Sequence, residues 1–467
     1  MEQTTLSNKS RMLIFISLLV GSVVSSFLST ALNTALPSII SVLNVSVDTG
    51  QWITSGFSLA MGIVMPLTAF LITRFNTKPL FICGLLLFII GSVLCAVSTS
   101  FVPMMIGRIL QAASSGILTA MTQVVILSIF PKEKQGSYMG WYGLAVSAAP
   151  IVAPTIGGIL VDSLGWRSIF WIVAGLMGLV LVLALFSFSN VLPARKASFD
   201  VLSFAISIFA FGGITLGVGQ LSSKGISDPM TLIALVAGIL GSLLFVFRQL
   251  RSSEPFLDLR ILKYRNYTVS VLGSMVLYLI MMGGSVLTPL YLQRTLGFSA
   301  TVSGLLTLPG SLLSMICSPI AGKIYDKLGM KKLFMIGGCM FLLGNAGMAF
   351  PESLPVLIIA YSIRCGAISF MMMPFVTWGI AGIKDNNSTA HGTALLTSLR
   401  TIAGAIGTAV FVGIMSSAAQ SAAGIASPNP GTYGFRIAAV GMAAISLFMY
   451  IAGMILIRDE KPKRTGK

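Results

Sequence analysis

Long apolar stretches recur along this chain, and each is about as long as a helix that crosses a lipid bilayer. Of the 467 residues, 55% are hydrophobic and only 9% are charged. Backbone amides and carbonyls cannot stay unpaired in hydrocarbon, and runs of roughly 20 residues pair them by forming helices. The sequence therefore predicts an all-α integral membrane protein with fourteen spans, near residues 12–36, 52–73, 79–98, 102–129, 137–161, 168–190, 201–220, 229–248, 268–291, 300–321, 333–350, 355–380, 391–416 and 434–457.

The placement of positive charge gives these spans an orientation. Of the 30 Lys and Arg residues, only Arg167, Lys224, Arg294 and Arg436 fall in loops on one side. Three others lie inside spans, and the rest fall in the opposite loops and at both termini. The side rich in Lys and Arg faces the cytoplasm, so both termini are predicted to be cytoplasmic. Anionic lipid headgroups account for the net charge of +17, and no nucleic-acid partner is expected.

Two similar loop segments indicate a duplicated chain. Residues 69–78 read AFLITRFNTK, and residues 322–331 read GKIYDKLGMK. Each segment follows the second span of a six-span block, which is the pattern of an internal repeat. We predict an N-terminal six-helix bundle at 1–190, an inserted helix pair with a cytoplasmic connector at 191–265, and a C-terminal six-helix bundle at 266–467.

Three arginines, Arg108, Arg364 and Arg400, lie inside predicted spans. A guanidinium in hydrocarbon costs on the order of 3 kcal/mol unless water or a polar partner meets it. All 13 Asp and Glu residues map to loops or span ends, so no buried carboxylate is expected beside these arginines. We expect them to face a hydrated, positively charged interior that favours anionic or zwitterionic cargo. Ser and Thr stripes on the spans fit either helix packing or the wall of that interior.

Catalytic chemistry is not expected of this chain. Metal and acid–base sites need several His, Asp, Glu or Cys side chains in one cavity, and the sequence has one histidine and only peripheral acids. We predict no enzymatic activity, no metal and no cofactor. His391 begins the thirteenth span, where it is either a proton-coupling group or only a polar residue at the start of a helix.

The fifth predicted span carries the most specific motif. Residues 149–158 read APIVAPTIGG, with two Ala-Pro pairs before Gly157 and Gly158. Prolines bend a helix and small residues allow close helix contact. The motif resembles the antiporter signature of the major facilitator superfamily, and the fourteen-span layout resembles its drug:proton antiporter-2 branch of bacterial multidrug exporters. Residues 33–37 (NTALP) and 108–111 (RILQ) are similar to further motifs of this family.

The chain also departs from the family pattern. The first span commonly carries an Asp where Leu28 stands here. The first cytoplasmic loop usually has Asp-Arg-x-Gly, but Thr73 and Asn76 replace the Asp and the Gly. The second copy of this loop keeps Asp326 and Gly329. By the resemblance, these departures concern how protons are coupled and whether the cargo is cationic.

The resemblance implies a secondary active transporter that works by alternating access. It would export amphipathic small molecules across a bacterial cytoplasmic membrane in exchange for protons, as a monomer surrounded by membrane lipid. The expected substrate-binding residues are Asn33, Arg108, Gln111, Tyr142, Tyr278, Met282, Arg364, Met371, Trp378 and Arg400. The expected gating residues are Arg74, Lys78, Pro150, Pro154, Gly157, Gly158, Gly322, Asp326, Gly329 and Lys331. The alternatives are a translocator of lipid-like or anionic amphiphiles, and a sensor or scaffold that does not transport.

Overall fold

The computed structural model describes residues 7–45, 47–192, 200–224, 227–252, 255, 257–298, 300–350, 353–383, 389–424 and 429–458. Within these ranges the chain is helical and has no strand. The α-helices are α1 (Asn8–Leu43), α2 (Val47–Arg74), α3 (Thr77–Val97), α4 (Phe101–Ile129), α5 (Gln135–Leu164), α6 (Arg167–Ser187), α7 (Val201–Ser207), α8 (Gly213–Lys224), α9 (Pro229–Arg251), α10 (Arg265–Leu290), α11 (Ala300–Ala349), α12 (Leu354–Ala381), α13 (Thr389–Gly424) and α14 (Pro430–Leu456). Short π or 3₁₀ segments are η1 (Lys132–Lys134), η2 (Ile208–Gly212), η3 (Leu259–Lys263) and η4 (Tyr291–Thr295).

Each predicted span lies on one of these helices. The seventh span comprises α7, η2 and α8, and the tenth and eleventh spans both lie on α11. Over the described residues, eleven helices are long and apolar enough to cross a membrane. The prediction of an all-α membrane protein is therefore confirmed.

Short polar residues set several helix ends. The side chain of Ser7 accepts a hydrogen bond from the Ser10 amide at the start of α1, and Asp228 does the same for Thr231 at the start of α9. Such side chains satisfy amides that have no partner inside the helix. Asn44 ends α1 with a left-handed φ of 51°, a conformation that asparagine tolerates better than most residues.

The chain divides into two compact units. The first unit comprises Met1–Pro131, Ala145–Ile261 and Asp385–Ile402, and the second comprises Lys132–Leu144, Leu262–Lys384 and Ala403–Lys467. Both α5 and α13 contribute residues to each unit. The first unit also contains the helices of the inserted pair, which pack through small residues: a Cβ at Gly213 would lie 2.7 Å from the Cα of Gly238. The bundle boundaries predicted at residues 190 and 265 stay a prediction.

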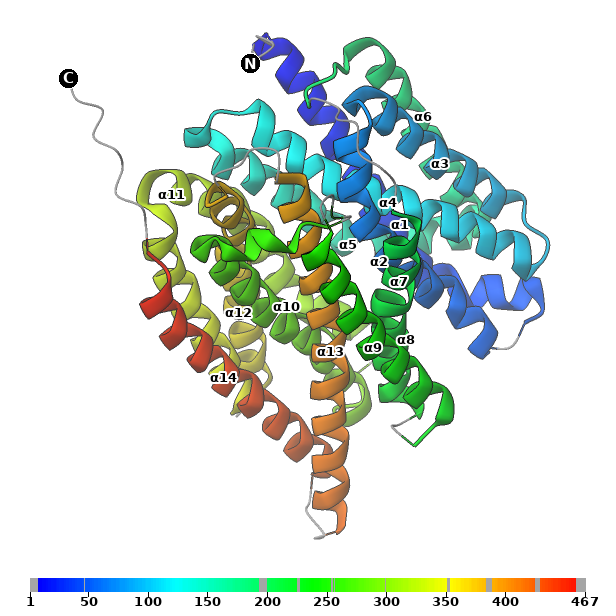
Figure 1. Cartoon of the computed structure of the whole chain (residues 1–467). Coiled ribbons are helices and arrows are strands. Elements are labelled where there is room, and N and C mark those ends of the chain that lie inside the picture. The colour runs from blue at the N-terminus through cyan, green and yellow to red at the C-terminus, as the bar shows by residue number, and fades with distance from the viewer. Residues whose placement is uncertain are drawn as a thin grey trace. The chain divides into compact units, whose positions relative to one another are not determined.

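Aromatic side chains fill the core of each unit. In the first unit, Phe81 of α3 stacks on Phe188, with ring centroids 4.5 Å apart. In the second unit, Tyr291 stacks on Phe435 at 4.2 Å. There α11, α12 and α14 run side by side (Figure 1).

Large apolar side chains also point outward. Phe186 is 87% exposed and Phe448 is 70% exposed. A water-soluble protein rarely shows extended apolar patches, whereas lipid requires them. The exposed surface therefore fits a multi-pass membrane protein.

Candidate functional site

Arg108 is the centre of a buried polar network in the first unit. Its side chain is only 1% exposed. The Nε atom donates to the carbonyl oxygen of Ile53 in α2 at 3.0 Å, and a terminal nitrogen donates to Oε1 of Gln111 at 2.8 Å. Gln111 then donates from Nε2 to Ser92 of α3 at 2.9 Å, and the guanidinium lies 4.1 Å from the ring centre of Phe57. The network of Arg108 and Gln111 thus links three helices.

The Ser and Thr stripes of α1 and α4 face each other. Ser25 donates to Ser115 at 2.7 Å, and the hydroxyls of Ser22 and Thr122 lie 3.1 Å apart. All four residues are buried. In this structure these stripes serve helix packing, the first of the two readings that the sequence left open.

Arg364 has the corresponding place in the second unit. It lies on α12, which carries the fourth span of the second block, and it is also 1% exposed. Its Nε donates to Oδ1 of Asn345 in α11 at 3.0 Å, and one terminal nitrogen donates to the carbonyls of Ile280 and Met281 in α10 at 2.7 and 3.0 Å. Asn345 continues the chain by donating to Ser446 of α14 at 3.0 Å.

Small residues make room for Arg364. A Cβ at Gly344 would lie 2.7 Å from the backbone nitrogen of Arg364, and a Cβ at Gly284 would overlap its guanidinium. Replacing either glycine would therefore displace the arginine or a whole helix.

The expectation that these arginines face water is wrong for Arg108 and Arg364. Both guanidinium groups point at backbone carbonyls and amide side chains inside a packed core. The lack of buried carboxylates does not leave these arginines unpaired, because every residue carries a carbonyl that accepts a hydrogen bond. Arg400 is buried as well, at 6% exposed. A role of the three arginines in substrate binding stays a prediction.

A second polar site joins the loop after the tenth span to the start of α5, within the second unit. Asp326 accepts hydrogen bonds from the amides of Gly136 and Ser137 at 2.9 and 2.8 Å and from the Ser137 hydroxyl at 2.7 Å. A carboxylate at a helix N-terminus satisfies unpaired amides and complements the helix dipole. Burial raises the pKa of Asp326, against the opposing effect of these hydrogen bonds.

The backbones approach closely beside this carboxylate. A Cβ at Gly322 would overlap the carbonyl oxygen of Gly136, and Ser318 donates to the carbonyl of Gly140 at 2.9 Å. Two of the predicted gating residues, Gly322 and Asp326, therefore act together on the first turns of α5.

The first copy of the loop makes different contacts. Lys78 donates from Nζ to the carbonyl of Leu185 at 2.7 Å, and its backbone amide donates to Asn190 at 3.0 Å. Arg74, at the end of α2, is exposed. No sequence signal pointed to Asn190, because its role depends on the path of the chain after α6.

The comparisons with known proteins agree with this architecture. The model of the Major Facilitator Superfamily matches residues 18–408. The chain belongs to this superfamily. It is 34% identical over 448 residues to the uncharacterized MFS-type transporter YcnB of Bacillus subtilis, covering 95% of both chains. It is 35% identical over 412 residues to the lincomycin resistance protein LmrB of Bacillus subtilis, covering 86% of this chain and 85% of that protein.

A solved structure shares the fold. The human organic anion transporter MFSD10 (TETRAN) superposes with a TM-score of 0.68 over 96% of this chain and 99% of that one. The sequences are 14% identical, so the likeness concerns the fold alone. The predicted major-facilitator fold is confirmed.

The remaining predicted substrate residues are distributed over several environments. Tyr278 and Met282 of α10 are half-buried and lie where a Cβ at Gly404 of α13 would touch them, at 2.7 and 2.8 Å. Tyr142, Met371 and Trp378 are buried. The side chain of Asn33 lies outside the described residues. Substrate binding by these residues stays a prediction.

The remaining gating residues are also only partly described. Gly329 has a φ of 78° inside α11, and Lys331 is exposed two residues later. Gly157 is buried and Gly158 is half-buried, whereas the side chains of Pro150 and Pro154 lie outside the described residues.

Sequence reasoning missed two hydrogen-bond partners. Asn345 was one amide in an otherwise apolar span, and a search for polar residues level with Arg364 would have found it. The partner of His391 was also missed: its Nδ1 accepts a hydrogen bond from the Asp258 amide at 3.3 Å. This contact ties the connector before α10 to the start of α13.

Proposed function

We propose that the protein exports amphipathic drug-like molecules across the cytoplasmic membrane by alternating access. The observation that carries this proposal is the similarity to the lincomycin resistance protein LmrB, at 35% identity over most of both chains. The mechanism follows from the duplicated spans, since two related halves can rearrange about a site that both contribute to. Both termini face the cytoplasm, and the transporter is a monomer.

The contact of Asp326 with α5 is our candidate for a cytoplasmic closing element. The carboxylate accepts three hydrogen bonds from Gly136 and Ser137, the two residues after the first residue of the helix. α5 then continues from the second unit into the first. The contact of Asp326 with the first turn of α5 can therefore couple the loop that carries Asp326 to a movement of this helix.

Exchange with protons is the coupling we propose. All 13 acids of the sequence map to loops or span ends, so a carboxylate in the middle of a span is not the carrier. His391 remains the candidate, because its Nδ1 can either accept the Asp258 hydrogen bond or hold a proton, but not both.

Selection for anionic cargo no longer has a structural reason. That preference depended on hydrated arginines, but Arg108 and Arg364 already donate to protein oxygens. We therefore propose a broad apolar specificity in place of the anion translocator considered from the sequence. The 25 methionines suit a surface that adapts to different molecules.

A resistance assay tests this function. A drug-sensitive bacterial host expressing the gene should tolerate more lincomycin and more cationic dye than a host carrying an empty vector. Unchanged tolerance to all compounds, with the protein present in the membrane, would refute export. A gain confined to anionic amphiphiles would restore the anion translocator.

Coupling is tested in inside-out membrane vesicles. With an acidified lumen, protons leave as substrate enters, so substrate should accumulate and a protonophore should abolish the accumulation. His391→Ala should reduce it, with Arg436→Ala as a control at an exposed position. Accumulation that ignores the proton gradient would refute proton exchange.

A further inference from the structure

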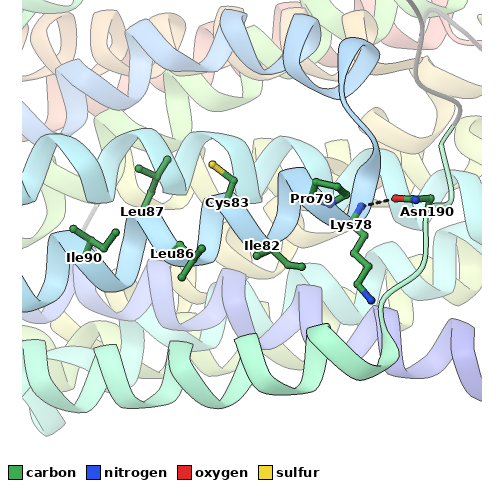
Figure 2. A pocket seen from close by; sticks show the side chains of 8 residues that line it. All are labelled: Lys78, Pro79, Ile82, Cys83, Leu86, Leu87, Ile90 and Asn190. Atoms are coloured by element: carbon green, nitrogen blue, oxygen red, sulfur yellow. Dashed lines mark hydrogen bonds between the residues drawn. The ribbon is translucent and has the colours of Figure 1, made fainter.

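An apolar groove runs along the outer face of α3 in the first unit. Its volume is about 640 Å³, and eight residues line it. Figure 2 shows the apolar side chains following one another along α3, with Lys78 and Asn190 at one end. The apolar lining residues are Pro79, Ile82, Cys83, Leu86, Leu87 and Ile90.

The wall of this groove is exposed. Leu86 is 41% exposed and Ile90 is 54% exposed. They lie on a helix whose length and composition allow it to cross a membrane. In a bilayer such side chains face lipid rather than water.

The length of the groove matches one leaflet. From Pro79 to Ile90 the helix rises about 16 Å, at roughly 1.5 Å per residue. The hydrocarbon core of a bilayer is about 30 Å thick, so the groove spans about half of it. An acyl chain of one leaflet covers the same depth.

The polar end of the groove is held in place by the chain after α6. The Asn190 side chain accepts from the Lys78 amide at 3.0 Å, and the Leu192 amide donates to Thr77 at 3.0 Å. The Lys78 ammonium uses one donor for the Leu185 carbonyl, at 2.7 Å, out of the three that an ammonium carries. A fixed positive group thus stands where a lipid headgroup would lie.

We propose that this groove binds one phospholipid with an anionic headgroup. The headgroup phosphate accepts from the ammonium of Lys78 and the amide of Asn190, and one acyl chain lies along α3 from Pro79 to Ile90. A second copy of the chain is a poorer occupant, because eight lining residues are far fewer than the roughly 20–30 per side of a stable protein interface.

Native mass spectrometry of the purified, full-length transporter tests this proposal. The protein is titrated in detergent with phosphatidylglycerol and, separately, with phosphatidylcholine. Wild type should retain one phosphatidylglycerol in preference to phosphatidylcholine. Lys78→Gln should weaken that adduct about fivefold, since one basic side chain contributes about 1 kcal/mol to binding an anionic lipid. Lys327→Gln is the matched control, because it removes the same charge from an exposed position in the second loop copy.

A second variant guards against loss of fold in Lys78→Gln, whose side chain also binds the end of α6. Cys83→Trp fills the groove and leaves Lys78 in place, so it should weaken the adducts of both lipids. Equal retention of both lipids by wild type would overturn the proposal. It would also be overturned if neither Lys78→Gln nor Cys83→Trp weakened the phosphatidylglycerol adduct.

A crosslinking experiment tests the competing occupant. A variant that keeps Cys83 as its single cysteine is treated with a bismaleimide in the membrane. The proposal predicts monomers, and efficient dimer formation through Cys83 would show that a second copy covers the groove.

Discussion

Each half of the chain buries an arginine on the fourth span of its block, but the two halves hold it differently. Arg364 donates to three oxygens on two other helices. Arg108 donates to one carbonyl on another helix and to Gln111 on its own helix, and it also packs on the ring of Phe57. The duplicated position is the same, whereas the partners have diverged. This difference indicates that each arginine stabilises the helices of its own half. The second unit should depend on its arginine more strongly than the first unit does.

The two loop copies also differ in their contacts. The second copy keeps the carboxylate of Asp326, which binds the start of α5. The first copy has Thr73 and Asn76 at the matching motif positions and instead uses Lys78 to bind the end of α6. The two halves therefore share the position of a buried arginine, whereas both the partners of that arginine and the contacts of the loop differ between them.

The largest expected effect follows the removal of Arg364. Arg364→Ala leaves Asn345 and two carbonyls without their donor and opens a cavity, which should lower the free energy of unfolding by about 3 to 5 kcal/mol. Equilibrium unfolding in mixed micelles measures this change. Arg436→Ala, at an exposed arginine, is the control and should change stability by less than about 0.5 kcal/mol.

Arg108→Ala should be the next most damaging change, at about 2 to 4 kcal/mol, because Gln111 keeps its bond to Ser92. The same unfolding measurement compares the two arginines. A larger loss for Arg108→Ala than for Arg364→Ala would show that counting cross-helix acceptors does not rank the two sites.

Asp326→Ala should lower stability by about 1 to 3 kcal/mol, because the first amides of α5 lose a charged acceptor. Thr73→Ala, at the matching position of the first loop copy, is the control and should have a smaller effect. Equal losses of unfolding free energy for Asp326→Ala and Thr73→Ala would show that the two loop copies contribute equally to stability.

The pH dependence of Asp326 sharpens this test. Burial raises its pKa above the ordinary value of 3.8. For an acid with a raised pKa in the folded state, the contribution to stability is fully present below the ordinary value and is lost as pH rises through the raised value. Asp326→Asn should remove this part of the pH dependence. Identical pH profiles of thermal unfolding for the variant and wild type would contradict it.

An ion pair in the inserted helices should give the smallest effect. Arg248 binds Asp200 at 2.8 Å, and the arginine is 38% exposed. Burial opposes ionisation of Asp200, but hydrogen bonds from Arg248 and Ser203 outweigh it and lower its pKa to about 2. Asp200→Asn should cost at most about 1 kcal/mol. In wild type, the contribution of ionised Asp200 to the free energy of unfolding should be constant above pH 3.8 and disappear as pH falls toward 2. A loss of stability between pH 5 and 8 could not come from Asp200.

The sequence predicts the helical spans well because length and hydropathy determine them. It shows that Ser and Thr residues recur at helical spacing without deciding what their faces contact, and it indicates Asp326 through the repeated loop. The partners of Arg108 and Arg364 could not be predicted. The carbonyls of Ile53 and Ile280 carry no side-chain signal, and only the packing of helices distant in sequence brings them to the guanidinium groups. The groove along α3 likewise depends on where Asn190 lies.

The left-handed glycine in α11 has a consequence for how the protein can be inserted. A straight helix of the 50 residues of α11 would be about 75 Å long, more than twice the roughly 30 Å of hydrocarbon it could occupy. The backbone at Gly329, with φ 78° and ψ −179°, is a conformation essentially restricted to glycine. Two spans can share α11 because the chain turns at Gly329, and a bulky replacement there would strain the backbone of this turn. The membrane's own thickness thus selects the residue at this turn.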